Sequence, residues 1–448
     1  MAGRLVIHPL SRGIRPIMVE LLTEAGKVID VKAGTTYYWD FAGTLRDKNP
    51  LDALQLTQRT GGLDFVAHAA AAARALEEIG HAKLSNNTYL SRNILLALDI
   101  IYGHITHFYQ NVLPDYIPYP QSGPFNPAKG DFRVSAAAGN LMINNMWRAF
   151  ALRQNIHRMM AILAGKAPHI CSIVFGGTTK HLKTDELIKI NSYLKELNNF
   201  IIDEYSSDVS QIETTYVHYF NIGAGNGNLL SVGEFPWENP TNCLLISGTN
   251  FSPTELNKKM ISIDCSRSWF NTDGGEEENL ASVFKPDPDK TGAYSWIKGA
   301  VYDNRPFEVG AVARMTVAGN TAVTGLGPRA QSVLGRYRAR LEESKLLVKK
   351  ISEWLEAIDL MNNTNSSLEL PDEGEAIGVA EASSGAVIHY ISIKDSLIDR
   401  YNVLDSLSWN LCPVTRGGQI GPIAKALLGL KVQGPNVTPD ILRVARSF

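Results

Sequence analysis

Five long stretches of the sequence place apolar residues at the spacing of one helix face, and they constrain the fold more than any other feature. The longest pattern runs from Arg329 to Leu360, and the others cover residues 67–80, 92–112, 147–163 and 184–205. Helices of this length bury one face against a partner element. We therefore expect a mainly helical body around a shared core.

The first forty residues have a different pattern. Residues 3–38 mix Val, Ile, Tyr and Thr with turn signals near Gly26 and Gly34, which is typical of short strands. Residues 206–310 are rich in Gly, Asn and Pro and are predicted to form loops with short strands. We predict an α+β fold in a single domain over residues 1–448, with a β-rich N-terminal portion (1–40) and a helical body with β additions (41–448).

Composition excludes several classes of partner. The chain has 448 residues, a formal net charge of −2 and no long basic run, so neither nucleic acid nor an anionic membrane is an expected partner. The most apolar long stretch, Ile94–Val112, contains Asp99, His104 and His107, which indicates a buried helix instead of a membrane span. The 4 cysteines lie far apart without a C-x-x-C pair and are predicted to be isolated core residues. They do not define the cellular compartment.

Short motifs along nearly the whole chain follow one order. They are Arg59–His68, Ser91–Asn93, His104–Tyr109, Pro168–His169, Phe175–Thr178, Gly233–Pro236, Tyr294–Lys298, Phe307–Gly310, Gly335–Arg336, Ser408–Asn410, Ala426–Gly429 and Ile441–Phe448. In this order they resemble the large subunit of [NiFe]-hydrogenases. The resemblance implies a hydrogenase large-subunit-like fold and a partner, an iron–sulfur small subunit.

The metal motifs of that family are where the sequence departs from it. The family's R-x-C-G-x-C-x-x-x-H has Gly61 and Asp64 at its two cysteine positions, and the chain ends at Phe448, where the family continues into a second cysteine pair. Low-valent nickel and iron require soft thiolate ligands. We therefore expect no cofactor in this chain, with iron–sulfur clusters confined to the partner subunit. Further family groups are replaced at Ile14, Ala42, Ser384 and Leu407.

The resemblance leaves a remnant pocket to consider. Its candidate residues are Arg59, Asp64, His68 and Trp409. Asp64 and His68 lie four residues apart at the start of a predicted helix, so they can share one face, yet two ligands are too few for a metal site. The alternative to a metal site is a structural role, in which Asp64 caps the helix and His68 is hydrogen-bonded. Arg59 is expected to pair with Asp64 or with a backbone carbonyl. We expect a collapsed, partly apolar pocket that holds at most water.

Two hypotheses about the function of the protein follow from these features. In the first, the protein is a structural or assembly subunit of an electron-transfer complex, without hydrogen chemistry of its own. In the second, it is a repurposed redox subunit that binds a quinone or another small molecule. The second reading draws on similarity to the quinone-site subunit of respiratory complex I at His8–Gly13 and Leu63–Phe65, although Arg12 and Phe65 replace the family's reactive His and Tyr. The compartment stays open, because family large subunits can be exported together with their partner.

Overall fold

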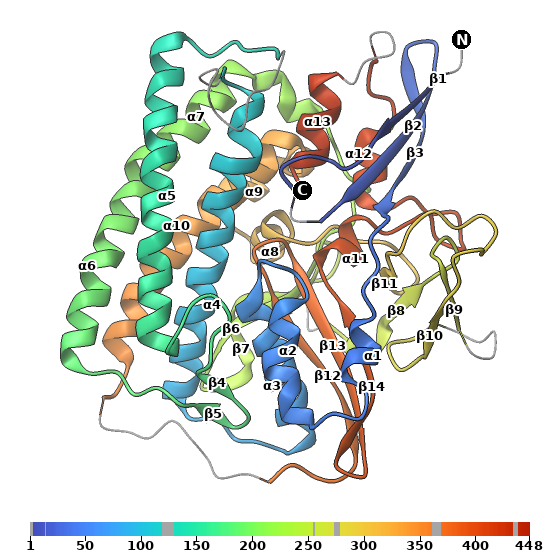
Figure 1. Ribbon diagram of the computed structural model, residues 1–448. Helices are drawn as coiled ribbons and strands as arrows, with labels where there is room; N and C mark the ends of the chain where they lie inside the picture. The colour runs from blue at the N-terminus through green and yellow to red at the C-terminus, as the bar shows by residue number, and fades with distance from the viewer. Residues whose placement is uncertain are drawn as a thin grey trace.

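Long helices form one side of the molecule in the computed structural model, which describes residues 3–13, 15–118, 130–253, 256–272, 278–360, 369–432 and 438–448 (Figure 1). These helices are α4 (Asn86–Thr106), α5 (Ala136–Ala164), α6 (Thr184–Phe200), α7 (Ser206–Thr215) and α10 (Val333–Ala357). Three of them begin at serine caps: Ser85, Ser135 and Ser332 each accept a hydrogen bond from a backbone N–H in the first turn. The prediction of a mainly helical α+β fold is confirmed.

The N-terminal portion is the predicted small sheet. Strands β1 (Gly3–Ile7), β2 (Ile17–Glu24) and β3 (Lys27–Thr35) pair antiparallel in sequence order. Strand β2 buries Val19 and Leu21 on one face, while Glu20 on the other face forms an ion pair with Arg4 of β1. This alternation follows the two-residue period of a strand that is covered on one side. The short helices α1 (Phe41–Leu45) and α2 (Ala53–Leu56) then lead to α3 (Phe65–Ile79).

A second three-stranded sheet packs against helix α3. It consists of β12 (Gly374–Glu381), β13 (Ala386–Lys394) and β14 (Leu397–Leu404), paired antiparallel in that order. This sheet was not predicted from the sequence. Small residues let the two elements approach closely: α3 carries a run of buried alanines, and a Cβ at Gly378 of β12 would lie only 1.9 Å from the carbonyl oxygen of Ala71. This contact fixes the position of α3 against the sheet.

The remaining elements fill the space between the helices and the two sheets. The residues between 206 and 310 contain more regular structure than predicted, since β6 (Leu230–Trp237) and β7 (Asn239–Thr249) form a long hairpin. No helix of the described residues is long and apolar enough to cross a membrane. The other elements are β4 (Ile173–Val174), β5 (Gly177–Thr178), β8 (Ile261–Asp264), β9 (Phe270–Thr272), β10 (Phe284–Pro286), β11 (Gly299–Tyr302), α8 (Ala311–Val317), α9 (Thr321–Thr324), α11 (Ser406–Asn410), α12 (Pro422–Leu427) and α13 (Pro439–Arg446).

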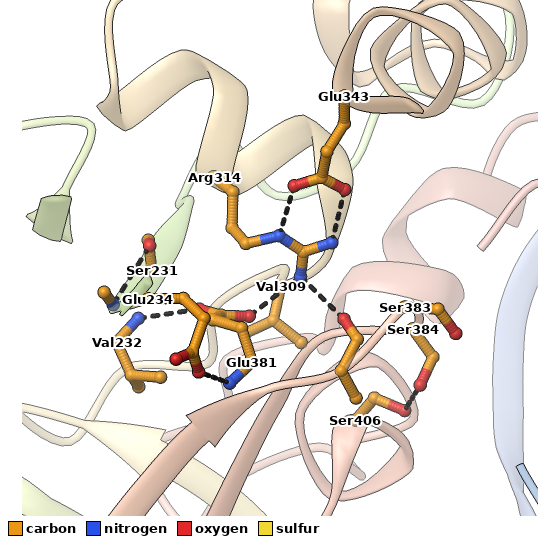
Figure 2. A network of polar contacts seen from close by, with 12 residues as sticks. Ser231, Val232, Glu234, Val309, Arg314, Glu343, Glu381, Ser383, Ser384 and Ser406 are labelled. Carbon is orange, nitrogen blue, oxygen red and sulfur yellow. Dashed lines mark hydrogen bonds and ion pairs between the residues drawn. The ribbon is translucent and has the colours of Figure 1, made fainter. Parts of the chain in front are cut away.

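A buried ion network joins the helical side to the second sheet (Figure 2). Arg314 on α8 donates two hydrogen bonds of 2.6 Å to Glu343 on α10 and one of 2.8 Å to Glu381 on β12. All three side chains are fully buried. Burial alone would raise the pKa of Glu343, but the charge and hydrogen bonds of Arg314 outweigh it and lower the pKa to about 2. The pKa of Glu381 is raised to about 7, because burial outweighs the charge of Arg314 there.

Candidate functional site

Asp64 directly precedes helix α3 and has a left-handed backbone conformation with φ of 63°. Its carboxylate does not cap the helix, so the predicted Asp cap is wrong. Instead, Oδ1 accepts hydrogen bonds from the backbone N–H and the hydroxyl of Ser383, at 3.1 and 2.6 Å, and Oδ2 accepts one from the hydroxyl of Ser384 at 2.5 Å. Ser384 in turn contacts Ser406, with 2.7 Å between the hydroxyl oxygens (Figure 2). Asp64 therefore ties α3 to the turn between β12 and β13.

Asp64 and His68 line a cavity of about 160 Å³. Its walls come from the segment after β1, the start of α3, the end of α4, the β12–β13 turn, the segment before α11 and the last residues of the chain. One water needs only about 10–15 Å³ of such space. The predicted collapse of this pocket is therefore wrong. Apolar side chains, among them Leu63, Val387 and Phe448, make up much of its wall, as predicted, and charged and hydroxyl groups line the rest.

His68 belongs to a buried chain of hydrogen bonds. Its Nδ1 lies 3.0 Å from Nε2 of His389 on β13, and Nδ1 of His389 lies 2.7 Å from the hydroxyl of Tyr401 on β14. All three side chains are buried. Burial lowers the pKa of His68 to about 4 and holds the pKa of His389 well below its usual value, so both rings are neutral near pH 7.

An ion pair between Arg15 and Asp405 forms another part of the cavity wall. Nη1 of Arg15 lies 2.7 Å from Oδ2 of Asp405, and Nη2 donates to the carbonyl of Thr60 at 2.8 Å. Asp405 also caps α11, accepting from the backbone N–H of Leu407 at 3.1 Å. Burial alone would raise the pKa of Asp405, but the charge of Arg15 outweighs it and the pKa is lowered. The cavity thus holds an anionic and a cationic group side by side.

His104 at the end of α4 and His107 in the helical turn that follows it form another part of the cavity wall. Nε2 of His104 lies 2.6 Å from Oε2 of Glu343, and Nε2 of His107 lies 2.8 Å from the carbonyl oxygen of Arg446. Burial lowers the pKa of both rings, most strongly for His107. Both line the cavity, and so does Arg12, which forms an ion pair with Asp115. His104 connects the cavity with the Arg314 network.

The structure brings together only half of the predicted site residues. Arg59 is exposed on a short 3₁₀ turn, and its guanidinium donates to the carbonyl of Gln55, outside the cavity. Trp409 is fully buried in a second apolar cluster next to β8 and β11 and does not line the cavity either. Sequence reasoning missed Arg15, Asp405, His389 and Tyr401, because each becomes part of the site only through contacts far along the chain. Ile14 lies outside the described residues.

Comparison with known proteins identifies the family. The model of the nickel-dependent hydrogenases matches residues 42–129 and 119–448. The chain belongs to the nickel-dependent hydrogenase family. It is 29% identical to the periplasmic [NiFeSe] hydrogenase large subunit of Desulfomicrobium baculatum, over 99% of this chain and 93% of that protein. It is 23% identical to the hydrogenase-2 large chain of Escherichia coli, over 100% and 96%.

Solved structures give the same result. The fold matches the Dm. baculatum [NiFeSe]-hydrogenase with a TM-score of 0.94 and 30% identity, covering 100% of this chain and 98% of that one. The reduced [NiFeSe] hydrogenase of D. vulgaris Hildenborough gives the same TM-score and coverage. The expected hydrogenase large-subunit-like fold is therefore confirmed. The comparisons support hydrogenase relatives and add no support for a purely structural subunit or for the quinone reading.

The family membership also corrects the expectation of a chain without a cofactor. The matching model is described as nickel-dependent, and the first relative is named for a [NiFeSe] centre, so that expectation conflicts with the family. The donor set in the described residues nevertheless does not fit a thiolate-held metal pair. No cysteine lines the cavity, and no group of three or more His, Cys, Asp or Glu side chains in the described part of the chain is placed to hold a metal ion. Measuring the nickel content of the purified protein directly tests whether the family's metal or the observed donor set decides the outcome.

Proposed function

We propose that this protein is the large subunit of a heteromeric oxidoreductase and pairs with an iron–sulfur small subunit. The observation that carries the proposal is the match along the whole chain to hydrogenase large subunits, at a TM-score of 0.94. Hydrogenase large subunits pair with an iron–sulfur small subunit. In the proposed division of labour, electrons pass through the partner's clusters, and this chain supplies the cavity at Asp64 and His68.

The charged and hydroxyl groups that line part of the cavity favour a role in handling protons. Asp64, His68, Arg15 and Asp405 line the cavity together with the hydroxyl groups of Ser383 and Ser384, and positioned carboxylates and imidazoles can accept and donate protons. A subunit that served only as a scaffold would be expected to fill such a space with apolar side chains, because an unfilled cavity costs about 24 cal/mol per Å³. The retained cavity therefore supports a part in the reaction of the complex.

The N-terminal segment offers a surface for the partner. Five large apolar side chains between residues 3 and 39 are at least 40% exposed: Val6, Leu22, Ile29, Tyr37 and Trp39. Aromatic residues at the centre of an interface contribute much of its binding energy. We propose that the iron–sulfur subunit covers this segment, with Trp39 as an anchor. The exposed Trp147 belongs to α5, a helix on the opposite side of the molecule from the N-terminal sheet (Figure 1).

The test is association of the co-expressed subunits, measured by native mass spectrometry and by titration of the separated chains. The wild-type chain should form a one-to-one complex with a protein that carries iron and labile sulfide. Trp39→Glu should weaken the complex at least about tenfold, equivalent to about 1.4 kcal/mol, whereas the matched control Trp147→Glu should bind like wild type. Equal affinity of both variants would contradict the proposed interface, and no association of the wild-type chain would contradict the proposed function.

A further inference from the structure

A second cavity lies behind the wall of the first. Its volume is about 150 Å³, and its lining includes Tyr38, Trp296, Lys298 and Tyr401. Tyr38 and Trp296 stack with ring centroids 4.7 Å apart. Arg15 and Asp405 line both cavities, so their ion pair forms part of the wall between them. Both volumes are large enough to hold water.

A series of three hydrogen-bonded side chains crosses this wall. It begins at His68, which lines the first cavity, passes through His389 and ends at Tyr401, which lines the second. The two contacts, of 3.0 and 2.7 Å, are within normal hydrogen-bond range. The free ring nitrogen of His68, Nε2, faces Gly61: a Cβ built on that glycine would lie 3.5 Å from it. Each of the three residues belongs to a different element, namely α3, β13 and β14.

The surroundings keep all three groups neutral. Burial lowers the pKa of His68 to about 4 against the opposing charges of Asp405 and Asp64, and Arg15 lowers it further. Burial also holds the pKa of His389 well below the usual value and raises the pKa of Tyr401 well above it. A neutral imidazole has one donor and one acceptor nitrogen, and a phenol can do both. The three groups can therefore all donate in the same direction along the chain.

We propose that His68, His389 and Tyr401 form a proton relay between the two cavities. In one passage, Nε2–H of His68 gives its proton to a water or base in the first cavity. The proton on Nε2 of His389 moves to Nδ1 of His68, and the phenol proton of Tyr401 moves to Nδ1 of His389. Water in the second cavity returns one proton to the Tyr401 oxygen. One proton enters, one leaves, and both rings end in the opposite tautomer, ready for passage in reverse.

Lys298 gives the second cavity a group that exchanges protons near neutral pH. Burial lowers the pKa of its ammonium to about 8. Its Nζ donates to Oδ1 of Asn402 at 3.1 Å and lies 4.5 Å from the ring centroid of Phe284. The amine lines the same cavity as Tyr401. Lys298 can therefore supply a proton to water at the Tyr401 end of the relay, while the three relay groups stay uncharged.

The relay is tested by two variants on the full chain. Tyr401→Phe removes the terminal hydroxyl and keeps the ring. The matched control is Tyr390→Phe on β13, whose hydroxyl bonds Glu375 at 2.6 Å, away from the chain of three groups. The readouts are ¹⁵N NMR spectra of the labelled histidine rings and the exchange of the His389 ring proton with D₂O. Neither readout requires a partner subunit or turnover.

We expect Tyr401→Phe to change the tautomer signals of both His389 and His68 and to slow exchange of the His389 ring proton at least about tenfold. Tyr390→Phe should match wild type in both. If Tyr401→Phe does not fold, His68→Gln closes the other end and should slow the same exchange. Unchanged His68 signals and unchanged exchange would overturn the relay. The use of the relay in redox chemistry rests on the proposed function, but its connectivity does not, so the two can fail separately.

Discussion

Replacement of Asp64 is the sharpest stability test of the site. Its side chain accepts three hydrogen bonds, two from Ser383 and one from Ser384, and its backbone has φ of 63°. Asp64→Ala removes both acceptor oxygens, and with them all three hydrogen bonds, and places alanine in a left-handed conformation that L-residues with a Cβ avoid. Asp64→Asn keeps one acceptor oxygen and a side chain that tolerates this conformation. Asp64→Gly removes the acceptors and relieves the strain.

The contacts set the expected size of each effect. A net value of about 1 kcal/mol for each partly buried bond gives about 3 kcal/mol, and the left-handed alanine adds roughly 1 kcal/mol. We therefore expect Asp64→Ala to cost about 4 kcal/mol, Asp64→Gly about 3 kcal/mol and Asp64→Asn about 1–2 kcal/mol. The order follows from geometry, since only alanine combines both losses.

Urea denaturation, followed by circular dichroism, measures this series. The matched control is Asp52→Ala, because Asp52 is exposed and its side chain makes no cap hydrogen bond. It should change the free energy of unfolding by no more than about 0.5 kcal/mol. The reasoning is refuted if alanine and asparagine at position 64 destabilise the protein equally, because the acceptor oxygen that asparagine keeps and its tolerance of the left-handed conformation would then make no difference.

Three other changes have defined outcomes. Arg314→Met should lower the free energy of unfolding by about 3–5 kcal/mol in urea denaturation, because Glu343 and Glu381 stay buried without their cation; a loss below 1 kcal/mol would contradict this. Because the pKa of Glu381 is raised to about 7, its protonated form stabilises the protein at acidic pH, and this contribution is lost as the pH rises toward 7. Glu381→Gln should therefore reduce the fall in melting temperature between pH 5 and 8. An unchanged dependence of melting temperature on pH would contradict this. Gly378→Ala should destabilise by about 1–3 kcal/mol or more, since its Cβ would meet the carbonyl of Ala71 at 1.9 Å; a neutral result by thermal melting would show that α3 can shift.

The sequence predicts the elements whose signals are local. The 3.6-residue period locates α4, α5 and α10, although α4 begins at Asn86 and α5 at Ala136, earlier than the predicted residues 92 and 147. The N-terminal sheet follows from alternation within residues 3–38. In the sheet β12–β14, which was missed, the central strand β13 is buried along almost its whole length. A strand buried on both faces shows no alternation.

The site was harder to predict, because its contacts join distant parts of the chain. Asp64 bonds Ser383 across 319 residues, and Arg15 pairs with Asp405, so no spacing rule connects them. Arg59 was selected because it precedes Asp64 in the same motif, but the intervening turn directs it outward. Asp64 and His68 were selected because they occupy positions of the family motif, and both lie at the start of one predicted helix. Family resemblance located the cavity, and only the structure shows which residues line it.

The measurement that tests the central claim most directly is the composition of the complex that contains this chain. Co-expression with an iron–sulfur small subunit, followed by native mass spectrometry and iron and sulfide analysis, reports the partner and its clusters together. The account predicts a one-to-one complex in which the 49.2 kDa chain is joined by a partner with bound iron and labile sulfide. A chain that stays alone at 49.2 kDa, without associated iron, would contradict it.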